Sequence, residues 1–365
     1  MACDPASRAG ALLDVDLAAI AANWRSLRAR AAPAECAAVI KADAYGLGAG
    51  AVAPALAAAG CRRFFVATLD EGIAARAALR SCCEIAVLNG PFAGTEAEFL
   101  AYRLVPVLND PGQIALWRRA APSRPALLHL DTGMSRLGLS LREFAAAAED
   151  LRDLSWHGLL SHLACADEPL HPLNEMQRRS FLEARAALPE PPASLSASSG
   201  IFLGPAFHFD LVRPGAALYG VNPQPGNPNP MRPVVRLQGR ILQVREIDAG
   251  QPVGYGAAWA APAPARLATV ALGYADGWLR SFGGRGSGRL GGMRVPLVGR
   301  VSMDLTVFDV TAVDPALARP GAFITLLDED YGVDEAAADC GTIGYEVLTA
   351  LGRRYHRRYR GRPAC

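Results

Sequence analysis

Residues 37–48 read Ala37-Ala-Val-Ile-Lys41-Ala-Asp-Ala-Tyr45-Gly-Leu-Gly48. The apolar run before Lys41 predicts a buried strand, and the two glycines after Tyr45 predict a turn that leads into a helix. Lys41 is therefore expected at the C-terminal end of a strand, at the start of a βα unit. In barrels of parallel strands, the working residues lie at these strand ends.

Lys41 is the only lysine of the chain, because the other 36 of its 37 cationic residues are arginine. A lysine amine can lose its proton and form an imine with an aldehyde, whereas an arginine guanidinium stays protonated. A chance surface lysine is the alternative interpretation. The buried strand before Lys41 argues against a solvated side chain, so Lys41 is the candidate nucleophile.

Short apolar runs alternate with alanine-rich helical stretches from residue 35 to about residue 220, which is typical of βα repeats. The predicted strands are residues 36–41, 64–68, 85–88, 105–108, 126–130, 157–163, 194–198 and 211–218. The predicted helices include residues 49–59, 70–79, 111–120, 141–151 and 172–187. Eight strands in this pattern predict an α/β fold of the (β/α)8 barrel type. A doubly wound sheet is the alternative, but no G-x-G-x-x-G motif follows the first strand.

A proline-rich segment, residues 222–230, separates this repeat from the rest of the chain. Strand-like runs follow it at residues 234–244, 266–272, 295–298, 305–310 and 322–327. We therefore predict a barrel domain over residues 1–225 and a smaller β-rich domain over residues 226–365. Residues 12–30 are expected to form a strand and then a helix capped by Asp16, and to plug or flank the barrel.

Composition argues against several classes of function. The net charge of +2 is spread along the chain, which does not favour a nucleic-acid partner. The eight cysteines form no CxxC pair and no Cys/His spacing of a zinc site, so we expect no metal. The N-terminus lacks a signal-peptide pattern and no uncharged run is long enough to span a membrane. We expect a cytoplasmic protein that binds no membrane.

Further motifs follow predicted strands and end in polar or small residues. They are His129-Leu-Asp-Thr-Gly-Met-Ser-Arg136, Ser161-His162, Ser198-Ser199-Gly200 and Arg213-Pro-Gly215-Ala216. A serine hydroxyl and free backbone N–H groups after the last two strands suit a phosphate, which many barrels bind there. Each motif alone also fits a simpler role, such as a helix cap, a hydrogen-bonded core histidine or an ion-paired arginine.

Together these motifs resemble those of the alanine racemases, a family of pyridoxal-phosphate-dependent enzymes of fold type III. Residues 41–48 are similar to the cofactor-attachment motif of the family, and the resemblance runs in order from residue 15 to residue 346. Its C-terminal part rests on Gly-Tyr255-Gly, Gly-Tyr274-Ala-Asp-Gly, Ser-Met303-Asp304 and Tyr345-Glu. The resemblance implies interconversion of L- and D-alanine, with D-alanine destined for peptidoglycan. It also implies a head-to-tail homodimer whose active sites take residues from both chains.

The resemblance assigns roles to the residues that hold the cofactor and move protons. Lys41 would carry pyridoxal phosphate as a Schiff base and act as one base. Tyr255 of the partner subunit would be the second base. Arg213 would face the pyridine nitrogen, and His162 would link Arg213 by hydrogen bonds towards the second base. The groups that would hold the phosphate are Tyr45, Ser199, Gly215, Ala216 and Tyr345.

The substrate side of the site differs from the family pattern in one respect. Arg136 and the backbone N–H of Met303 would bind the substrate carboxylate. Many family members have a lysine, often carbamylated, where this chain has His129. With no second lysine available, His129, a water or an anion would orient Arg136. The residues expected to narrow the entrance or support the site are Tyr274, Tyr345 and Asp304.

Three alternatives remain open at this point. A basic amino-acid decarboxylase or a D-threonine aldolase would share the barrel and the lysine, but is not expected to carry the motifs around Tyr255, Tyr274 and Met303. A broad-specificity or serine racemase of the same family is harder to separate. A non-catalytic protein that buffers pyridoxal phosphate would resemble the barrel alone, and the second domain argues against it.

The first prediction concerns Lys41. Borohydride reduction of the purified protein should fix one pyridoxyl group on this side chain, because reduction makes an imine between lysine and the cofactor permanent. Peptide mass spectrometry measures the mass gain and its position. A reduced chain that gains no mass would remove the central assignment.

Overall fold

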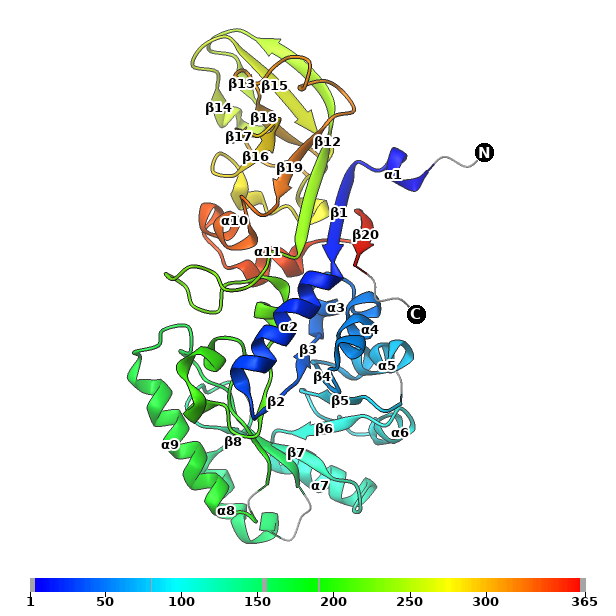
Figure 1. Cartoon of the computed structure of the whole chain (residues 1–365), viewed down its shortest axis with the longest axis vertical. Helices are drawn as coiled ribbons and strands as arrows, with labels where there is room; N and C mark the ends of the chain where they lie inside the picture. The colour runs from blue at the N-terminus through cyan, green and yellow to red at the C-terminus, as the bar shows by residue number, and fades with distance from the viewer. Residues whose placement is uncertain (1–3, 80, 153–155, 190, 362–365) are drawn as a thin grey trace. The chain divides into compact units, whose positions relative to one another are not determined.

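The computed structural model describes residues 4–79, 81–152, 156–189 and 191–361. The chain divides into two compact units. The barrel unit runs from Ile20 to Arg232, and the β unit combines the described residues up to Ala19 with those from Pro233 onward. Figure 1 labels the helices and strands of both units.

The barrel unit is a ring of short parallel strands. Seven strands pair in the order β10-β9-β7-β6-β5-β4-β3, and β11 pairs with β2. Backbone hydrogen bonds of 2.9 Å close the ring, from Ala37 N–H to Val212 O and from Arg213 N–H to Ser196 O. The predicted (β/α)8 barrel is therefore confirmed. Its strands are β2 (Glu35–Cys36), β3 (Ala38–Val39), β4 (Arg63–Val66), β5 (Glu84–Val87), β6 (Val105–Leu108), β7 (Ala126–Asp131), β9 (Trp156–Leu160), β10 (Ala193–Ser194) and β11 (Leu211–Val212), with β8 (Leu139–Ser140) pairing only with β7.

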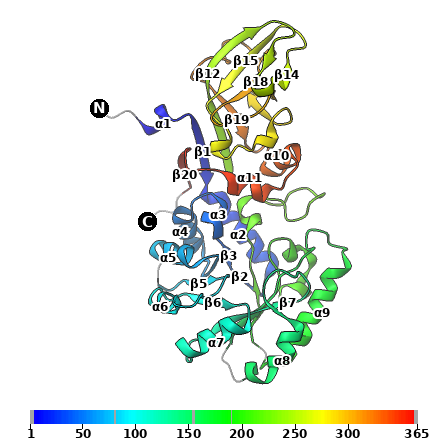
Figure 2. The same cartoon turned by 180° about the vertical axis from the view of Figure 1, so that it is seen from behind.

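Helices lie around the outside of this ring in both views (Figures 1 and 2). Local capping starts several of them: the Thr68 side chain accepts from the Glu71 N–H, and the Asp110 side chain accepts from the Gln113 N–H. The five predicted helices are present. The helices are α2 (Leu17–Ala31), α4 (Ala49–Ala59), α5 (Leu69–Ala78), α6 (Glu96–Ala101), α7 (Pro111–Ala120), α8 (Leu141–Arg152) and α9 (Pro172–Ala186). Within the described ranges, no helix is both long and apolar enough to cross a membrane.

Five predicted strands are too long at their C-terminal ends by two or more residues. They stop at Val39, Val66, Leu160, Ser194 and Val212, instead of residues 41, 68, 163, 198 and 218. The chain then turns through α3 (Lys41–Tyr45) and through two 3-10 turns, η1 (Ser199–Leu203) and η3 (Ala216–Tyr219). These turns are partly buried and rich in small and apolar residues. The apolar run that predicts a strand therefore continues in the sequence after the strand itself has ended. The turns bring polar groups to the rim of the ring.

The β unit is built on a closed antiparallel barrel. Its strands follow the order β15-β18-β17-β16-β19-β12, and a further pairing of β15 with β12 closes the ring. The strands are β12 (Val235–Ile247), β15 (Ala265–Val270), β16 (Ser287–Leu290), β17 (Met293–Val298), β18 (Thr306–Asp309) and β19 (Phe323–Leu327). Leu237, Phe308, Ile324 and Leu326 are fully buried in its core. The predicted β-rich second domain is confirmed in its architecture.

The first strand, β1 (Ala11–Asp16), differs from its expected place. It lies between β12, antiparallel, and β20 (His356–Arg360), parallel, and so belongs to the β unit rather than plugging or flanking the barrel. Leu13 and Val15 are fully buried, and both Asp14 carboxylate oxygens accept hydrogen bonds from Arg358. The division of the chain therefore departs from the predicted 1–225 and 226–365. Periodicity shows that a strand is buried, but it does not identify the strand that pairs with it.

Candidate active site

A cavity of about 330 Å³ opens at the C-terminal ends of the barrel strands. Side chains at the C-terminal ends of β3, β4, β5, β7 and β9, or in the segments that follow them, contribute to its wall. It is lined by Val39, Lys41, Tyr45, Phe65, Ala67, Leu88, Asn89, His129, Arg136, Leu137, Leu160, His162, Ala197 and Arg213. Six predicted site residues of the barrel unit therefore meet in one cavity: Lys41, Tyr45, His129, Arg136, His162 and Arg213. None of the lining residues is a carboxylate.

Lys41 carries an amine whose protonated form is disfavoured. Burial lowers its pKa, and the positive charges of Arg136 and Arg213 lower it further. Glu71 acts in the opposite direction. A lysine with a lowered pKa is a better nucleophile at neutral pH, because more of it carries a free electron pair.

The turn after Lys41 has an unusual backbone. Ala42, Asp43, Ala44 and Tyr45 have φ values of 52°, 53°, 54° and 55°. This left-handed conformation costs about 1–2 kcal/mol per residue for side chains other than glycine. The Ala42 N–H donates a 2.7 Å hydrogen bond to Glu71, and the Ala49 N–H donates one of 2.7 Å to Asp43. Strain of this kind persists only where surrounding contacts hold it, and it is concentrated at functional sites.

Arg213 is a buried cation on the inner wall, with 4% of its surface exposed. It donates to the Ser161 carbonyl at 2.6 Å and to the Ser194 hydroxyl. Burial lowers its pKa to about 10, so the guanidinium keeps its proton at neutral pH. The buried positive charge has no carboxylate partner within the described residues. It therefore favours an anion or an electron-rich atom in the cavity.

The ring of His129 is held in one tautomer. Its Nδ1 lies 2.8 Å from Asn109 Oδ1, while Asn109 Nδ2 donates to the carbonyls of Leu88 and Val107, both at 3.0 Å. Carbonyls only accept, so the amide nitrogen must face them and Oδ1 must face the ring. His129 Nδ1 is therefore the donor. Burial, with the charges of Arg213 and Arg136, lowers the His129 pKa to about 3, which leaves Nε2 as a neutral acceptor.

His162 is also neutral. Burial is the main cause that lowers its pKa to about 3, and the nearby charges of Arg213, Arg136 and Lys41 add to the effect. The cavity therefore combines two neutral histidines with three basic side chains. A ligand carrying negative charge matches this field better than a neutral one.

Gly215 and Tyr45 form a close contact beside the cavity. A Cβ atom on residue 215 would lie 2.3 Å from the Tyr45 hydroxyl, so only glycine fits there. The Ser198 hydroxyl accepts hydrogen bonds from the N–H groups of Gly215 (3.1 Å) and Ala217 (3.2 Å). The sequence motif predicts a role for Ser199 and none for Ser198. Ser199 itself begins η1, and Ala216 begins η3.

The remaining predicted residues lie in the β unit, mostly on exposed turns. Tyr255 is 72% exposed, Met303 54%, Tyr274 42% and Tyr345 39%. The backbone of Tyr274 donates to Ser302 O at 3.0 Å, so the turns carrying Tyr274 and Met303 lie side by side. Asp304 pairs with Arg354 at 2.7 Å. Exposed aromatic and methionine side chains of this kind are common at contacts with a partner.

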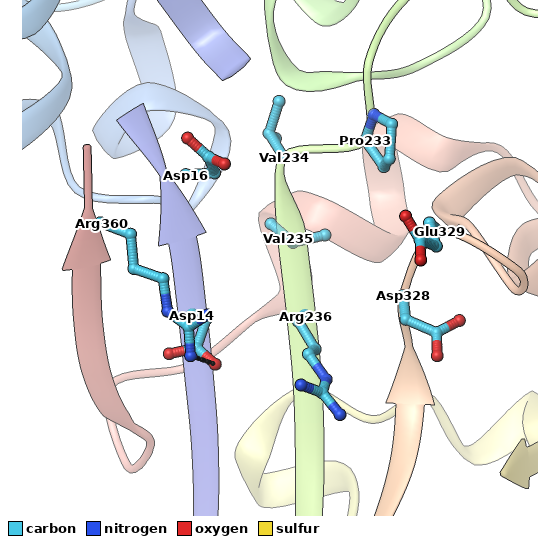
Figure 3. A pocket seen from close by; sticks show the side chains of 9 residues that line it. All are labelled: Asp14, Asp16, Pro233, Val234, Val235, Arg236, Asp328, Glu329 and Arg360. Atoms are coloured by element: carbon cyan, nitrogen blue, oxygen red, sulfur yellow. Dashed lines mark hydrogen bonds and ion pairs between the residues drawn. The ribbon is translucent and has the colours of Figure 1, made fainter. Parts of the chain in front are cut away.

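A second cavity of about 400 Å³ lies within the β unit (Figure 3). Its wall comes from β20, β1, β12 and the end of β19. Asp14 is already bound by Arg358 and Arg360, at 2.6 Å and 3.1 Å. The lining residues are Asp14, Asp16, Pro233, Val234, Val235, Arg236, Asp328, Glu329 and Arg360, none of which was predicted as a site residue. It contains no amine, thiol, hydroxyl or imidazole and none of the predicted site residues, so the first cavity is the candidate active site.

Sequence reasoning missed two residues that support this site. Asn109 directly precedes Asp110, and the pair predicts only a helix start. Glu71 stands three residues after Thr68, a spacing that indicates a capping box, and this box is present. Neither pattern reveals that Asn109 orients His129 or that Glu71 binds the backbone after Lys41.

Two family models match nearly the whole chain. Residues 15–223 match the model described as alanine racemase, N-terminal domain. Residues 234–359 match the model described as alanine racemase, C-terminal domain. The two matched ranges contain every predicted site residue.

The chain is also similar to individual proteins over its full length. An alanine racemase of Rhodospirillum rubrum is 56% identical over 362 residues, covering 97% of each chain. A catabolic alanine racemase of Mesorhizobium japonicum is 49% identical over 362 residues, covering 97% of this chain and 94% of that one. The crystal structure of alanine racemase from Bartonella henselae with covalently bound pyridoxal phosphate has a TM-score of 0.92 at 40% identity, covering 96% of this chain and 99% of the other.

The lowered pKa of His129 predicts a pH dependence of stability. Between pH 6.5, the ordinary histidine pKa, and about pH 3, the unfolded chain binds a proton at residue 129 that the folded chain does not. The free energy of unfolding should therefore fall as the pH drops, by about 1.4 kcal/mol per pH unit for this residue. His129→Gln should remove that contribution between pH 6.5 and 5 in the cofactor-free protein, as measured by urea unfolding. An unchanged slope in the variant would contradict the assignment.

Proposed function

Since the chain belongs to the alanine racemase family, we propose that it interconverts L-alanine and D-alanine, with pyridoxal phosphate bound to Lys41. The observation that carries this proposal is the position of Lys41. Its amine has a lowered pKa and lies in a cavity lined by Arg136 and Arg213 and by no described carboxylate. Such a cavity suits a ligand that bears both a phosphate and an aldehyde.

The residues around the cavity fit pyridoxal phosphate. When bound, this cofactor draws electrons from the amino acid attached to it and so acidifies the α-proton. Tyr45, Ser199, Gly215 and Ala216, together with Tyr345, hold the phosphate. The contact between the Tyr45 hydroxyl and Gly215 supports this assignment, because a side chain at residue 215 would collide with that hydroxyl and displace it.

Arg213 controls the pyridine nitrogen of the cofactor. A guanidinium has no acceptor and does not give up its proton, so it donates a hydrogen bond and leaves that nitrogen unprotonated. An unprotonated ring withdraws electrons less strongly, which limits side reactions. The full burial of Arg213 and its two hydrogen bonds to Ser161 and Ser194 support a fixed orientation.

Racemisation removes a proton from one face of the α-carbon and returns one to the other face, so two bases are required. Lys41 is the base on one face. Tyr255 of the partner subunit is the base on the other, in a head-to-tail homodimer. The exposure of Tyr255 within its own chain, at 72%, supports a role that is completed by a second subunit.

The substrate carboxylate is bound by Arg136 and by the Met303 N–H. Among the described residues, Arg136 has neither a hydrogen bond nor an ion pair with the protein, which leaves its guanidinium available. In the absence of any second lysine, the neutral acceptor His129 Nε2 on the same cavity wall, a water or an anion would orient Arg136. Tyr274 and Tyr345 narrow the entrance, and Asp304 supports it through its ion pair with Arg354.

The D-alanine produced is proposed to serve peptidoglycan synthesis. A catabolic role is the second candidate, because the Mesorhizobium japonicum relative carries that description. Genetic replacement separates the two: a biosynthetic enzyme restores growth of a D-alanine auxotroph, whereas a catabolic one restores growth on alanine as carbon source.

The activity itself is tested by polarimetry on a panel of amino acids. We expect rapid loss of optical rotation with L-alanine and with D-alanine, and at least tenfold slower change with serine. A faster change with serine would favour a broad-specificity or serine racemase. No change with any amino acid, in protein that holds pyridoxal phosphate, would favour a non-catalytic binding protein.

Tyr255→Phe should lower the rate of racemisation by about 10²–10⁴-fold, the usual contribution of one general base. Cofactor binding should be spared, because Lys41 is unchanged. Exchange of the α-proton of L-alanine with deuterium, followed by NMR, should fall more than exchange with D-alanine. Tyr102→Phe, which removes a hydroxyl from a half-exposed tyrosine of the barrel unit, is the matched control. Equal exchange of both enantiomers by the Tyr255 variant would rule out the two-base scheme.

A further inference from the structure

The backbone after Lys41 is held by a side chain from another βα unit. Glu71, in the first turn of α5, accepts a 2.7 Å hydrogen bond from the Ala42 N–H at its Oε1. Its Oε2 accepts from the N–H groups of Ala67 (2.7 Å) and Thr68 (3.3 Å). One carboxylate therefore connects the segment that follows β3 with the segment that follows β4.

The hydrogen bond to Ala42 controls the geometry of Lys41. The Ala42 N–H belongs to the peptide group that joins Lys41 to Ala42, so fixing it fixes the ψ angle of Lys41. This angle sets the direction of the Lys41 Cα–Cβ bond relative to the peptide group that Glu71 holds. The four left-handed residues that follow, 42–45, do not adopt their conformation without such contacts.

We propose that Glu71 is a positioning residue that aims the Lys41 amine at the aldehyde of the cofactor. This inference rests on the proposed function. In the step concerned, the Lys41 nitrogen attacks the aldehyde carbon, a C=N bond replaces the C=O bond, and the oxygen leaves as water. Glu71 does not touch the cofactor; it holds the backbone from which the amine extends.

Glu71 also acts on Lys41 through its charge, and this effect changes the rate of reaction with the aldehyde in the opposite direction to positioning. Its negative charge raises the pKa of the amine, while Arg136 and Arg213 lower it. Removing the charge would leave more of the amine unprotonated, and reaction with the aldehyde would become faster. Removing the positioning contact would make it slower. The direction of the change therefore separates positioning from electrostatics.

Glu71→Gln isolates the contact with Ala42. A glutamine side chain has only one carbonyl oxygen to accept hydrogen bonds. The backbone N–H groups of Ala67 and Thr68 compete for this oxygen with the backbone N–H of Ala42. The oxygen is expected to face the pair, which keeps the start of α5 intact and turns the amide NH2 group towards the Ala42 N–H. The full-length protein, stripped of cofactor, is mixed with pyridoxal phosphate, quenched with borohydride at intervals, and analysed for mass gain at Lys41.

We expect Glu71→Gln and Glu71→Ala to slow this capture by about tenfold, and to weaken cofactor binding in an absorbance titration by a similar factor. Glu143→Ala is the matched control. Glu143 forms the same capping arrangement with Ser140 at the start of α8, but within the described residues its side chain hydrogen-bonds only to Ser140. It should lose helix-cap stability and retain the wild-type capture rate.

Capture by Glu71→Gln at the wild-type rate or faster overturns the proposal, and this variant alone decides if Glu71→Ala does not fold. The wild-type protein keeps the two hypotheses apart. If it gains no pyridoxyl group at Lys41, the proposed function fails. If it gains one and the glutamine variant matches it, only the positioning role of Glu71 fails.

Discussion

A strong excess of positive charge surrounds the Lys41 amine, and the chemistry of the cavity depends on it. Burial is the main cause that lowers the pKa of the amine, and the charges of Arg136 and Arg213 lower it further. The same two guanidiniums make the cavity unfavourable for a third cation and favourable for an anionic ligand. The two arginines thus contribute both to the lowered pKa of the amine and to the preference of the cavity for negative charge.

Buried charge also explains the state of the two histidines. His129 and His162 both have pKa values lowered to about 3, because burial and the arginines disfavour an additional proton. Asn109 then fixes which ring nitrogen of His129 carries the single hydrogen. The Nε2 atom of His129 is therefore a hydrogen-bond acceptor with a fixed orientation. His129 and Arg136 line the same cavity.

The strands of the barrel end at this site, and the turns that follow them position its side chains. The left-handed residues 42–45 and the contact between Gly215 and Tyr45 are both locally unfavourable or sterically demanding. They persist because side chains from neighbouring segments of the barrel unit hold them, as Glu71 holds the Ala42 N–H. The β unit is organised differently, around a closed antiparallel barrel. The N-terminal strand β1 pairs with β12 of this barrel, although more than 200 residues separate the two strands in the sequence.

The sequence by itself determined the alternation of strands and helices and the change to a β-rich composition after the proline-rich segment, and it singled out Lys41 as the candidate nucleophile. These follow from local patterns, since periodicity reports burial and a solitary lysine among arginines stands out by composition. Only the tertiary structure decided that β1 pairs with β12 and β20, that strands end at Val39, Ser194 and Val212, and that Glu71 and Asn109 support the site. Each of these depends on a contact between residues distant in sequence, and local patterns do not specify which distant groups will meet.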